Sequence, residues 1–137
     1  MITNIAHNAV TVRDMEESIR FYTEAMGFTK AFEIPRPETG EPWIVYMNLC
    51  RGQFLELFYG GETFEPWNDR QIGFNHFCFE VDDIFETVER IRAAGYAIDA
   101  EPKQGADMNW QAWVKDPNGI RIELMKISPE SPQAKYM

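Results

Sequence analysis

The chain has 137 residues, a net charge of −9 and 45 % apolar residues. This length suits one compact domain, and the apolar content is typical of a soluble globular protein. The acidic balance disfavours nucleic acid and anionic membranes as partners, because both require a basic surface. No apolar run approaches the ~20 residues that span a bilayer, and the first residues resemble no export signal, so we expect a cytoplasmic protein.

The two cysteines, Cys50 and Cys78, lie far apart in the sequence and form no CxxC motif. Their spacing disfavours both a disulfide framework and a zinc knuckle. We therefore expect two small, buried side chains on strands, a common place for free cysteines.

The first half of the chain is typical of a strand followed by a helix and three more strands. The first strand covers 4–12, and a capping box formed by Asp14 and Glu17 opens the helix. Gly27 suits the left-handed conformation that ends a helix. The later strands cover 29–34, 43–49 and 53–59, with a loop at 35–42 between the first two. The buried stripe of the helix is expected to consist of Met15, Ile19, Tyr22 and Met26.

The second half repeats this order, at an offset that falls along the chain from 69 to 68 and then to 67 residues. Strands are expected at 74–81, around 97–102, at 110–115 and at 120–127, and the tight turn DPNG at 116–119 joins the last two. Asp83 and Glu86 form the second capping box, and Gly95 ends the second helix. The second buried stripe consists of Ile84, Val88 and Ile91.

This repeat predicts an α+β fold in which two βαβββ modules form one domain of residues 1–137. The first module covers about 1–62 and the second about 73–127. The segment 61–73 links them, and 128–137 forms a polar tail that can be mobile or fold over a neighbour.

Four polar residues fall in register with the repeat. His7 and His76, the only histidines, occupy the same place in the first strand of each half, 69 positions apart. Glu56 and Glu123 occupy the same place in each last strand, 67 positions apart. Alternation along a strand puts all four on the concave face, opposite the helices. Because repeats place equivalent side chains symmetrically, we expect the four to converge on a pseudo-twofold axis.

Two imidazoles and two carboxylates are suitable ligands for a divalent transition metal. Glu56 lies among phenylalanines in QFLELF, where a carboxylate needs a partner, and a metal ion would supply one. The alternative is a structural polar network, in which the histidines are satisfied core residues and Glu123 pairs with Arg121 on the same face.

The motifs HNAVTVRDMEESIRFYTEAMGF, QFLELF, NHFCFEVDD and DPNGIRIELM together resemble the vicinal oxygen chelate superfamily over residues 4–127. This superfamily includes glyoxalase I, fosfomycin resistance proteins, extradiol dioxygenases, methylmalonyl-CoA epimerase and bleomycin resistance proteins. The resemblance implies the vicinal oxygen chelate fold, with a concave metal-binding sheet. The order His, Glu, His, Glu is similar to glyoxalase I, the lactoylglutathione lyase. It implies Ni, Co or Zn as the cofactor, with Mn or Fe as further options.

Glyoxalase I resemblance also implies a lyase or isomerase that transfers a proton through a metal-bound enediolate. Its substrate would be an α-hydroxycarbonyl compound such as a glutathione hemithioacetal. The resemblance favours Glu123 as the principal base and Glu56 as its partner. It further implies a homodimer, in which one chain or two can complete each metal site.

The residues expected to line the substrate site belong to the concave strands and to the segment DMNWQAW at 107–113. They are Phe54, Phe58, Asn109, Gln111, Trp113 and Arg121. The strand TKAFEIPR carries Glu33 where the glyoxalase I family typically has arginine, and aromatic residues surround the predicted cup. Two alternatives therefore stay open: an isomerase or epimerase of a sugar-derived or hydroxy-ketone substrate, and a resistance-type module that binds a small molecule.

Overall fold

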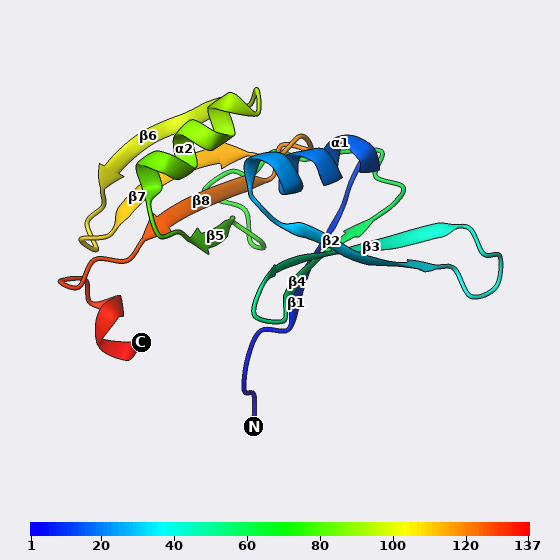
Figure 1. Cartoon of the computed structure of the whole chain (residues 1–137), viewed down its shortest axis with the longest axis horizontal. Coiled ribbons are helices and arrows are strands. Elements are labelled where there is room, and N and C mark those ends of the chain that lie inside the picture. Colours follow the sequence, from blue (N-terminus) through cyan, green and yellow to red (C-terminus); the bar gives the residue numbers. More distant parts are fainter. The chain divides into compact units, whose positions relative to one another are not determined.

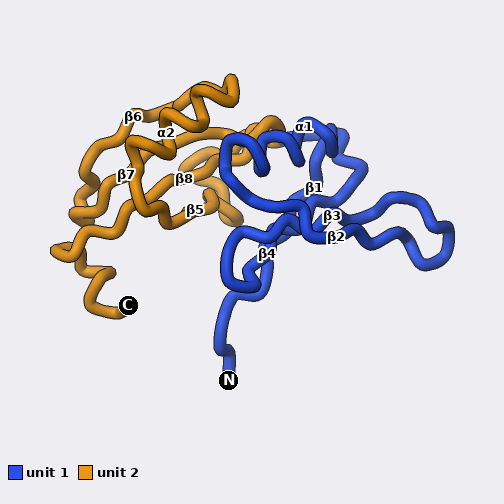
Figure 2. The backbone as a smooth tube through the Cα atoms, viewed as in Figure 1, with its two compact units in different colours: residues 1–64 blue, residues 65–137 orange.

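The computed structural model describes residues 1–137, and the chain divides into two compact units. The first unit covers residues 1–64 and the second 65–137 (Figure 2). The division falls inside the predicted linker, in a stretch between residues 59 and 76 that contains no helix or strand. No helix of the structure is long and apolar enough to cross a membrane.

The first unit has one four-stranded sheet and one helical segment (Figure 1). Its strands follow the order β1-β4-β3-β2, in which β1 runs parallel to β4 and the other pairs are antiparallel. The elements are β1 (His7–Thr11), α1 (Met15–Arg20), the π-helix η1 (Phe21–Ala25), β2 (Thr29–Pro35), β3 (Pro42–Cys50) and β4 (Gln53–Phe58).

The second unit has the same topology, with strand order β5-β8-β7-β6 and a parallel pair formed by β5 and β8. The predicted βαβββ repeat is therefore confirmed in both halves. The elements are β5 (Phe77–Glu80), α2 (Ile84–Ala93), β6 (Ile98–Gln104), β7 (Trp110–Lys115), β8 (Arg121–Lys126) and the short 3-10 helix η2 (Gln133–Tyr136).

The helices begin and end at the predicted residues. The Asp14 carboxylate accepts a hydrogen bond from the backbone N–H of Glu17, and the Asp83 carboxylate accepts from two N–H groups of its first turn. These N–H donors lower the pKa of Asp83, the bond from Glu86 most of all. Gly27 and Gly95 both have positive φ, of 76° and 91°, so each helix ends in the left-handed region.

The two helical segments differ in one respect. In the first unit α1 continues into η1, where the N–H of Met26 donates to the carbonyl of Phe21, five residues earlier. In the second unit α2 stays α-helical to Ala93, and the N–H of Ala94 donates to the carbonyl of Arg90, four residues earlier. Sequence periodicity alone did not predict the wider turn.

One face of each sheet forms the core under the helical segment. The side chains of that face are almost fully buried, and they alternate along the strands with the more polar residues of the other face. The buried sheet residues are Val45, Met47, Leu55 and Leu57 in the first unit, and Ala112, Val114, Ile122 and Leu124 in the second. Of the predicted helical stripes, Met15 and Tyr22 are buried in the first unit, whereas Ile19 and Met26 are only partly buried. In the second unit all three predicted residues are buried, Ile84, Val88 and Ile91.

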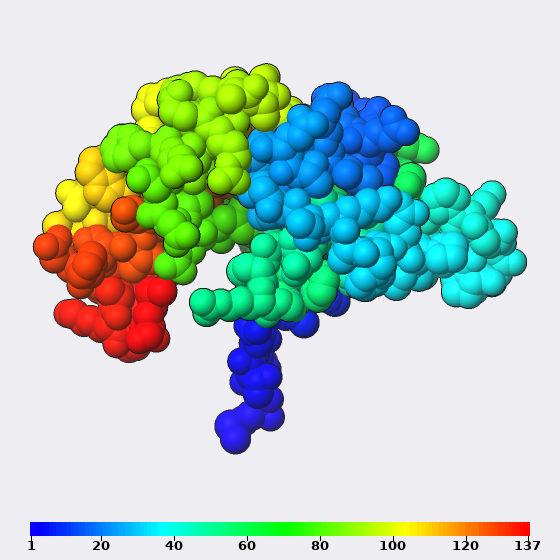
Figure 3. All heavy atoms as spheres, viewed as in Figure 1, coloured from blue at the N-terminus to red at the C-terminus, as the bar shows by residue number.

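Segments outside the sheets differ in how far they are exposed to solvent. Residues 1–6 are exposed ahead of β1 (dark blue in Figure 3), and residues 35–42 are exposed at the tip of the β2–β3 hairpin. The tail folds onto the second unit, where the side chain of Ser131 has no exposed surface.

The expectation that both cysteines are buried is wrong, since both are exposed. Cys50 is the last residue of β3, beside the turn that leads to β4. Cys78 lies on β5, which is at the edge of its sheet, and it points to the face that the helix does not cover.

Replacing Leu57 with alanine should lower the free energy of unfolding by about 2–5 kcal/mol, because the side chain is fully buried in β4 and its removal leaves a cavity. Ile72→Ala is the matched control: Ile72 is fully exposed, so the change should stay within about 0.5 kcal/mol. Urea unfolding followed by tryptophan fluorescence measures both variants. Equal losses for the two variants would contradict the assigned core.

Candidate metal and substrate site

In the first unit Glu56 lies at the centre of the sheet and is only 6 % exposed. Its neighbours in register are Ala9 on β1 and Tyr46 on β3, so their side chains share its face. Glu56 Oε1 lies 3.5 Å from Nδ1 of His7, whose side chain is half exposed. The Tyr46 hydroxyl donates a hydrogen bond to the Glu56 carboxylate. This bond raises the pKa of Tyr46, and burial and the negative charge of Glu56 add to the effect.

The second unit repeats this arrangement around Glu123, which is 5 % exposed. Its neighbours in register are Cys78 on β5 and Trp113 on β7. Glu123 Oε2 lies 3.0 Å from Nε2 of His76, which immediately precedes β5. Each unit therefore places one of the two histidines beside one of the two glutamates.

The Cys78 thiol lies beside the Glu123 carboxylate and donates a hydrogen bond to it. Protein atoms around the thiol reduce its hydration and raise its pKa to about 12, and the negative charge of Glu123 acts in the same direction. Cys78 is thus a neutral donor at physiological pH and not a thiolate.

Arg121 does not pair with Glu123, although the two share a face of β8. Its guanidinium lies over two indole rings, 4.0 Å from the centroid of Trp67 and 4.7 Å from that of Trp113. Its Nη1 donates to Oδ1 of Asn75, at 3.0 Å. The ion pairs that involve Glu56 and Glu123 are with histidine, and neither glutamate pairs with Lys or Arg.

The donor atoms in each unit suit a divalent cation, one imidazole nitrogen facing one carboxylate oxygen. At 3.0 Å the nitrogen of His76 and the oxygen of Glu123 are joined by a proton or by a cation, since two bare acceptors would repel each other. Neither unit by itself gathers three or more His, Cys, Asp or Glu side chains that could hold a metal. Each unit therefore presents two of the four predicted ligands.

The aromatic residues predicted to line the substrate site lie on the same faces as the glutamates. Phe54 belongs to a cluster with Phe32 and Tyr46, whose rings stack at 4.3 Å. Phe58 meets Trp43 edge-on, with ring centroids 6.0 Å apart. The concave side of the first sheet is therefore largely aromatic.

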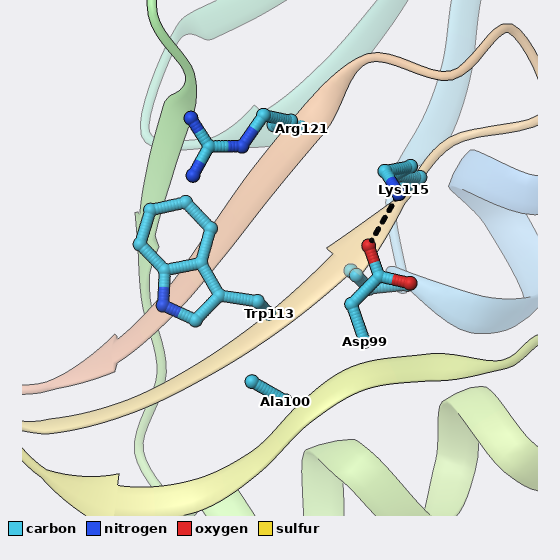
Figure 4. Close-up of a pocket in the computed structure, with 6 residues that line it drawn as sticks. Asp99, Ala100, Trp113, Lys115 and Arg121 are labelled. Atoms are coloured by element: carbon cyan, nitrogen blue, oxygen red, sulfur yellow. Dashed lines mark ion pairs between the residues drawn. The ribbon is translucent and has the colours of Figure 1, made fainter. Parts of the chain in front are cut away.

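In the second unit Trp113 and Arg121 line an open pocket of about 310 Å³. Figure 4 shows the guanidinium of Arg121 above the Trp113 indole, with the ion pair of Lys115 and Asp99 beside them. Lys115 Nζ lies 3.0 Å from an Asp99 oxygen, so the charge of Lys115 is balanced within the pocket. Arg121 has no carboxylate partner there, and its contacts are with the Asn75 amide and the two indole rings.

The two polar donors predicted from DMNWQAW are engaged within the protein. Asn109 has no exposed surface: its Nδ2 donates to Asp107 and Gln133, and its Oδ1 accepts from the backbone N–H of Ser128. Asn109 therefore fastens the tail to the second unit. Gln111 is partly exposed and donates to Asp107 at 3.2 Å.

Four further residues contact the site and were not predicted from the sequence: Tyr46, Trp67, Asn75 and Cys78. Tyr46 and Cys78 are strand neighbours of the glutamates, and alternation along β3 and β5 could have placed them on the face of the glutamates. Asn75 directly precedes His76 in the sequence, but nothing in the pattern indicates which way its side chain turns. Trp67 lies in the linker, where no periodicity applies.

Comparison with known proteins assigns the chain to a family. The model of the Glyoxalase/Bleomycin resistance protein/Dioxygenase superfamily matches residues 4–124. The chain belongs to this superfamily. The resemblance to the vicinal oxygen chelate proteins is therefore confirmed, and the paired βαβββ units are the fold of these proteins.

Individual members of the superfamily are moderately similar to the chain. A probable lactoylglutathione lyase of Vibrio parahaemolyticus is 35 % identical over 126 residues, and the match covers 89 % of this chain and 89 % of the relative. A probable lactoylglutathione lyase of Vibrio cholerae is 33 % identical, again over 89 % of each chain. The crystal structure of a glyoxalase family protein from Enterococcus faecalis matches with a TM-score of 0.73 at 23 % identity, over 90 % of this chain and 97 % of that one.

In a Cys50→Ser variant, iodoacetamide at pH 8.5 should alkylate the remaining Cys78 at least ~10-fold more slowly in the folded protein than in urea. The pKa of Cys78 is raised to about 12, so the thiol keeps its proton at pH 8.5, and only the thiolate reacts. Adding Glu123→Gln removes the neighbouring negative charge and should speed the reaction. Equal rates in folded and unfolded protein would contradict the contact with Glu123.

Asn109→Ala should lower the free energy of unfolding by about 1–3 kcal/mol, because it leaves the N–H of Ser128 without its partner and releases the tail. Limited proteolysis should then cleave the 128–137 segment faster. Asn68→Ala, at an exposed position of the linker, is the control. Unchanged stability together with unchanged cleavage of the 128–137 segment would contradict this role of Asn109.

Proposed function

We propose that the protein is a metal-dependent lyase of glyoxalase I type. It would isomerise an α-hydroxycarbonyl compound such as the hemithioacetal of glutathione. The observation that carries this proposal is a buried glutamate paired with a more exposed histidine on the face of each sheet opposite the helices, His7 with Glu56 and His76 with Glu123. The names of the Vibrio relatives, probable lactoylglutathione lyases, favour the same activity.

The four residues would together hold one divalent metal, supplied by one chain or by two chains of a homodimer. Nitrogen from imidazole and oxygen from carboxylate suit Ni²⁺, Co²⁺ or Zn²⁺. A metal bound there would draw electrons from neighbouring oxygens of the substrate and make the hydrogen on the adjoining carbon more acidic. Support comes from the burial of both glutamates and from their pairing with histidine in place of Lys or Arg.

Glu123 would move the proton. One carboxylate oxygen takes the hydrogen from the carbon that bears the hydroxyl group, and the same group returns it to the neighbouring carbon that was the carbonyl. One C–H bond breaks, one forms, and the hydroxyl proton passes to the other oxygen, so no external oxidant or reductant is needed. Glu56 accepts a hydrogen bond from the Tyr46 hydroxyl and would remain a metal ligand while Glu123 transfers the proton.

The rest of the substrate would lie against the aromatic faces. Phe54 and Phe58 offer apolar surface in the first unit, and Trp113 does so in the second. The guanidinium of Arg121, at the open pocket of the second unit, is suited to a carboxylate of a glutathione adduct. Gln111 lies on the same face of β7 as Trp113 and, unlike Asn109, keeps part of its surface exposed, so it would be available to donate to the substrate.

The decisive experiment measures metal content and turnover of the hemithioacetal formed from methylglyoxal and glutathione, before and after loading with Ni²⁺, Co²⁺ or Zn²⁺. We expect turnover that depends on the metal and is lost on chelation. Glu123→Gln should lower turnover by about 10²–10⁴-fold, since it removes the proton acceptor and keeps the shape of the side chain.

Glu16→Gln, at an exposed position in the first turn of α1, is the matched control and should keep full turnover. Full activity of Glu123→Gln would remove Glu123 as the base. Bound metal without turnover would keep the metal site and direct the search to hydroxy-ketone and sugar substrates. Absence of metal under every loading condition would overturn the proposal and favour a binding module.

A further inference from the structure

A chain of contacts in the second unit runs behind His76, on the side of the ring that faces away from Glu123. Arg121 Nη1 donates to Oδ1 of Asn75 at 3.0 Å, and the same oxygen lies 2.6 Å from Nδ1 of His76. Arginine has only donors, so the amide atom it meets is the oxygen, which can only accept. Nδ1 of His76 therefore carries a proton and donates it to Asn75. The other ring nitrogen, Nε2, is left to face Glu123 at 3.0 Å.

Aromatic side chains surround both Arg121, which orients Asn75, and the His76 ring. The Arg121 guanidinium lies over both the Trp67 and the Trp113 rings, at 4.0 and 4.7 Å from their centroids. Trp113 also meets the His76 ring edge-on, with centroids 4.8 Å apart. The imidazole thus has a hydrogen-bond acceptor behind it and an indole beside it, and both limit its rotation.

The first unit lacks this support. Ala6 occupies the position of Asn75, 69 residues earlier, and Phe54 occupies that of Arg121, 67 residues earlier. His7 faces its glutamate with Nδ1 and not Nε2, at 3.5 Å, and 50 % of its side chain is exposed, against 29 % for His76. The two His–Glu pairs therefore differ in support: His76 has the Asn75 amide beside its second ring nitrogen, and alanine stands at the corresponding position before His7.

We infer that Asn75 is a positioning residue of the metal site: it holds the Nδ1 proton of His76 so that Nε2 is presented to the metal beside Glu123. Arg121 orients the Asn75 amide for this purpose. A ligand histidine whose second nitrogen is hydrogen-bonded has a fixed ring orientation and a more basic metal-binding nitrogen, which strengthens metal binding. The inference rests on the proposed function, because it requires that His76 binds a metal.

Two measurements on purified protein test this role without any enzyme assay. The first is Zn²⁺ affinity, obtained by competition with a chromophoric chelator. The second is a long-range ¹H–¹⁵N spectrum of the Zn²⁺-loaded protein, which shows which nitrogen of each imidazole carries a proton and how fast that proton exchanges with water. With only two histidines in the chain, a His7→Ala variant assigns the signals.

Asn75→Ala, which installs the residue of the first unit, should weaken Zn²⁺ binding about 10-fold and speed exchange of the His76 Nδ1 proton. Asn75→Asp should restore both, because a carboxylate can accept from His76 and from Arg121 alike. Asn68→Ala, in the linker of the same unit, should change neither.

The outcomes separate this inference from the proposed function. A wild-type protein that takes up no Zn²⁺ overturns both. A wild-type protein that binds Zn²⁺, with Asn75→Ala equal to it in affinity and in ring-proton exchange, overturns the role of Asn75 and leaves the proposed metal site intact. Loss in Asn75→Ala without rescue by Asn75→Asp would also overturn it, since acceptance of the ring proton would then not be the cause.

Discussion

The first strand of each unit runs parallel to the last, and the faces of both sheets depend on this pairing. A parallel pair needs a long crossover, which the helical segment and two more strands supply here. The pairing joins parts of the chain that are far apart in sequence, so that His7 meets Glu56 and His76 meets Glu123. A shift of β4 or of β8 by one residue against its neighbours would turn the glutamate of that strand into the core beneath the helical segment.

The position of the glutamates carries an energetic cost that their surroundings offset in different ways. A carboxylate that is only about one-twentieth exposed loses most of its hydration, and each acceptor oxygen then requires a donor or a cation. Glu56 receives a tyrosine hydroxyl, a strong donor, whereas Glu123 receives a cysteine thiol, a weak one. The two units therefore share a topology and a pair of ligand types but differ in the groups around them.

Much of the fold could be predicted from the sequence because the signals are local. The capping aspartates Asp14 and Asp83 and the helix-ending Gly27 and Gly95 act through neighbouring backbone, and strand alternation gave the faces of Glu56 and Glu123 correctly. The surroundings of the site could not be predicted in this way. Whether Asn109 faces a ligand or a tail depends on where residues 128–137 fold, and the direction of Asn75 depends on Arg121, 46 positions later.

The π-helical turn at Phe21–Ala25 accounts for a detail of the repeat. Between Tyr22 and Gly27 the first unit has one residue more than the second has between Ile91 and Gly95, which is where the offset falls from 69 to 68. The bond from the Phe28 N–H to the Tyr22 carbonyl has its counterpart in the bond from Tyr96 to Ile91, one residue shorter. The additional residue of the first unit is thus accommodated in a single wider helical turn, and both helical segments still end at a glycine with positive φ. The wider turn is where the two repeats differ in length.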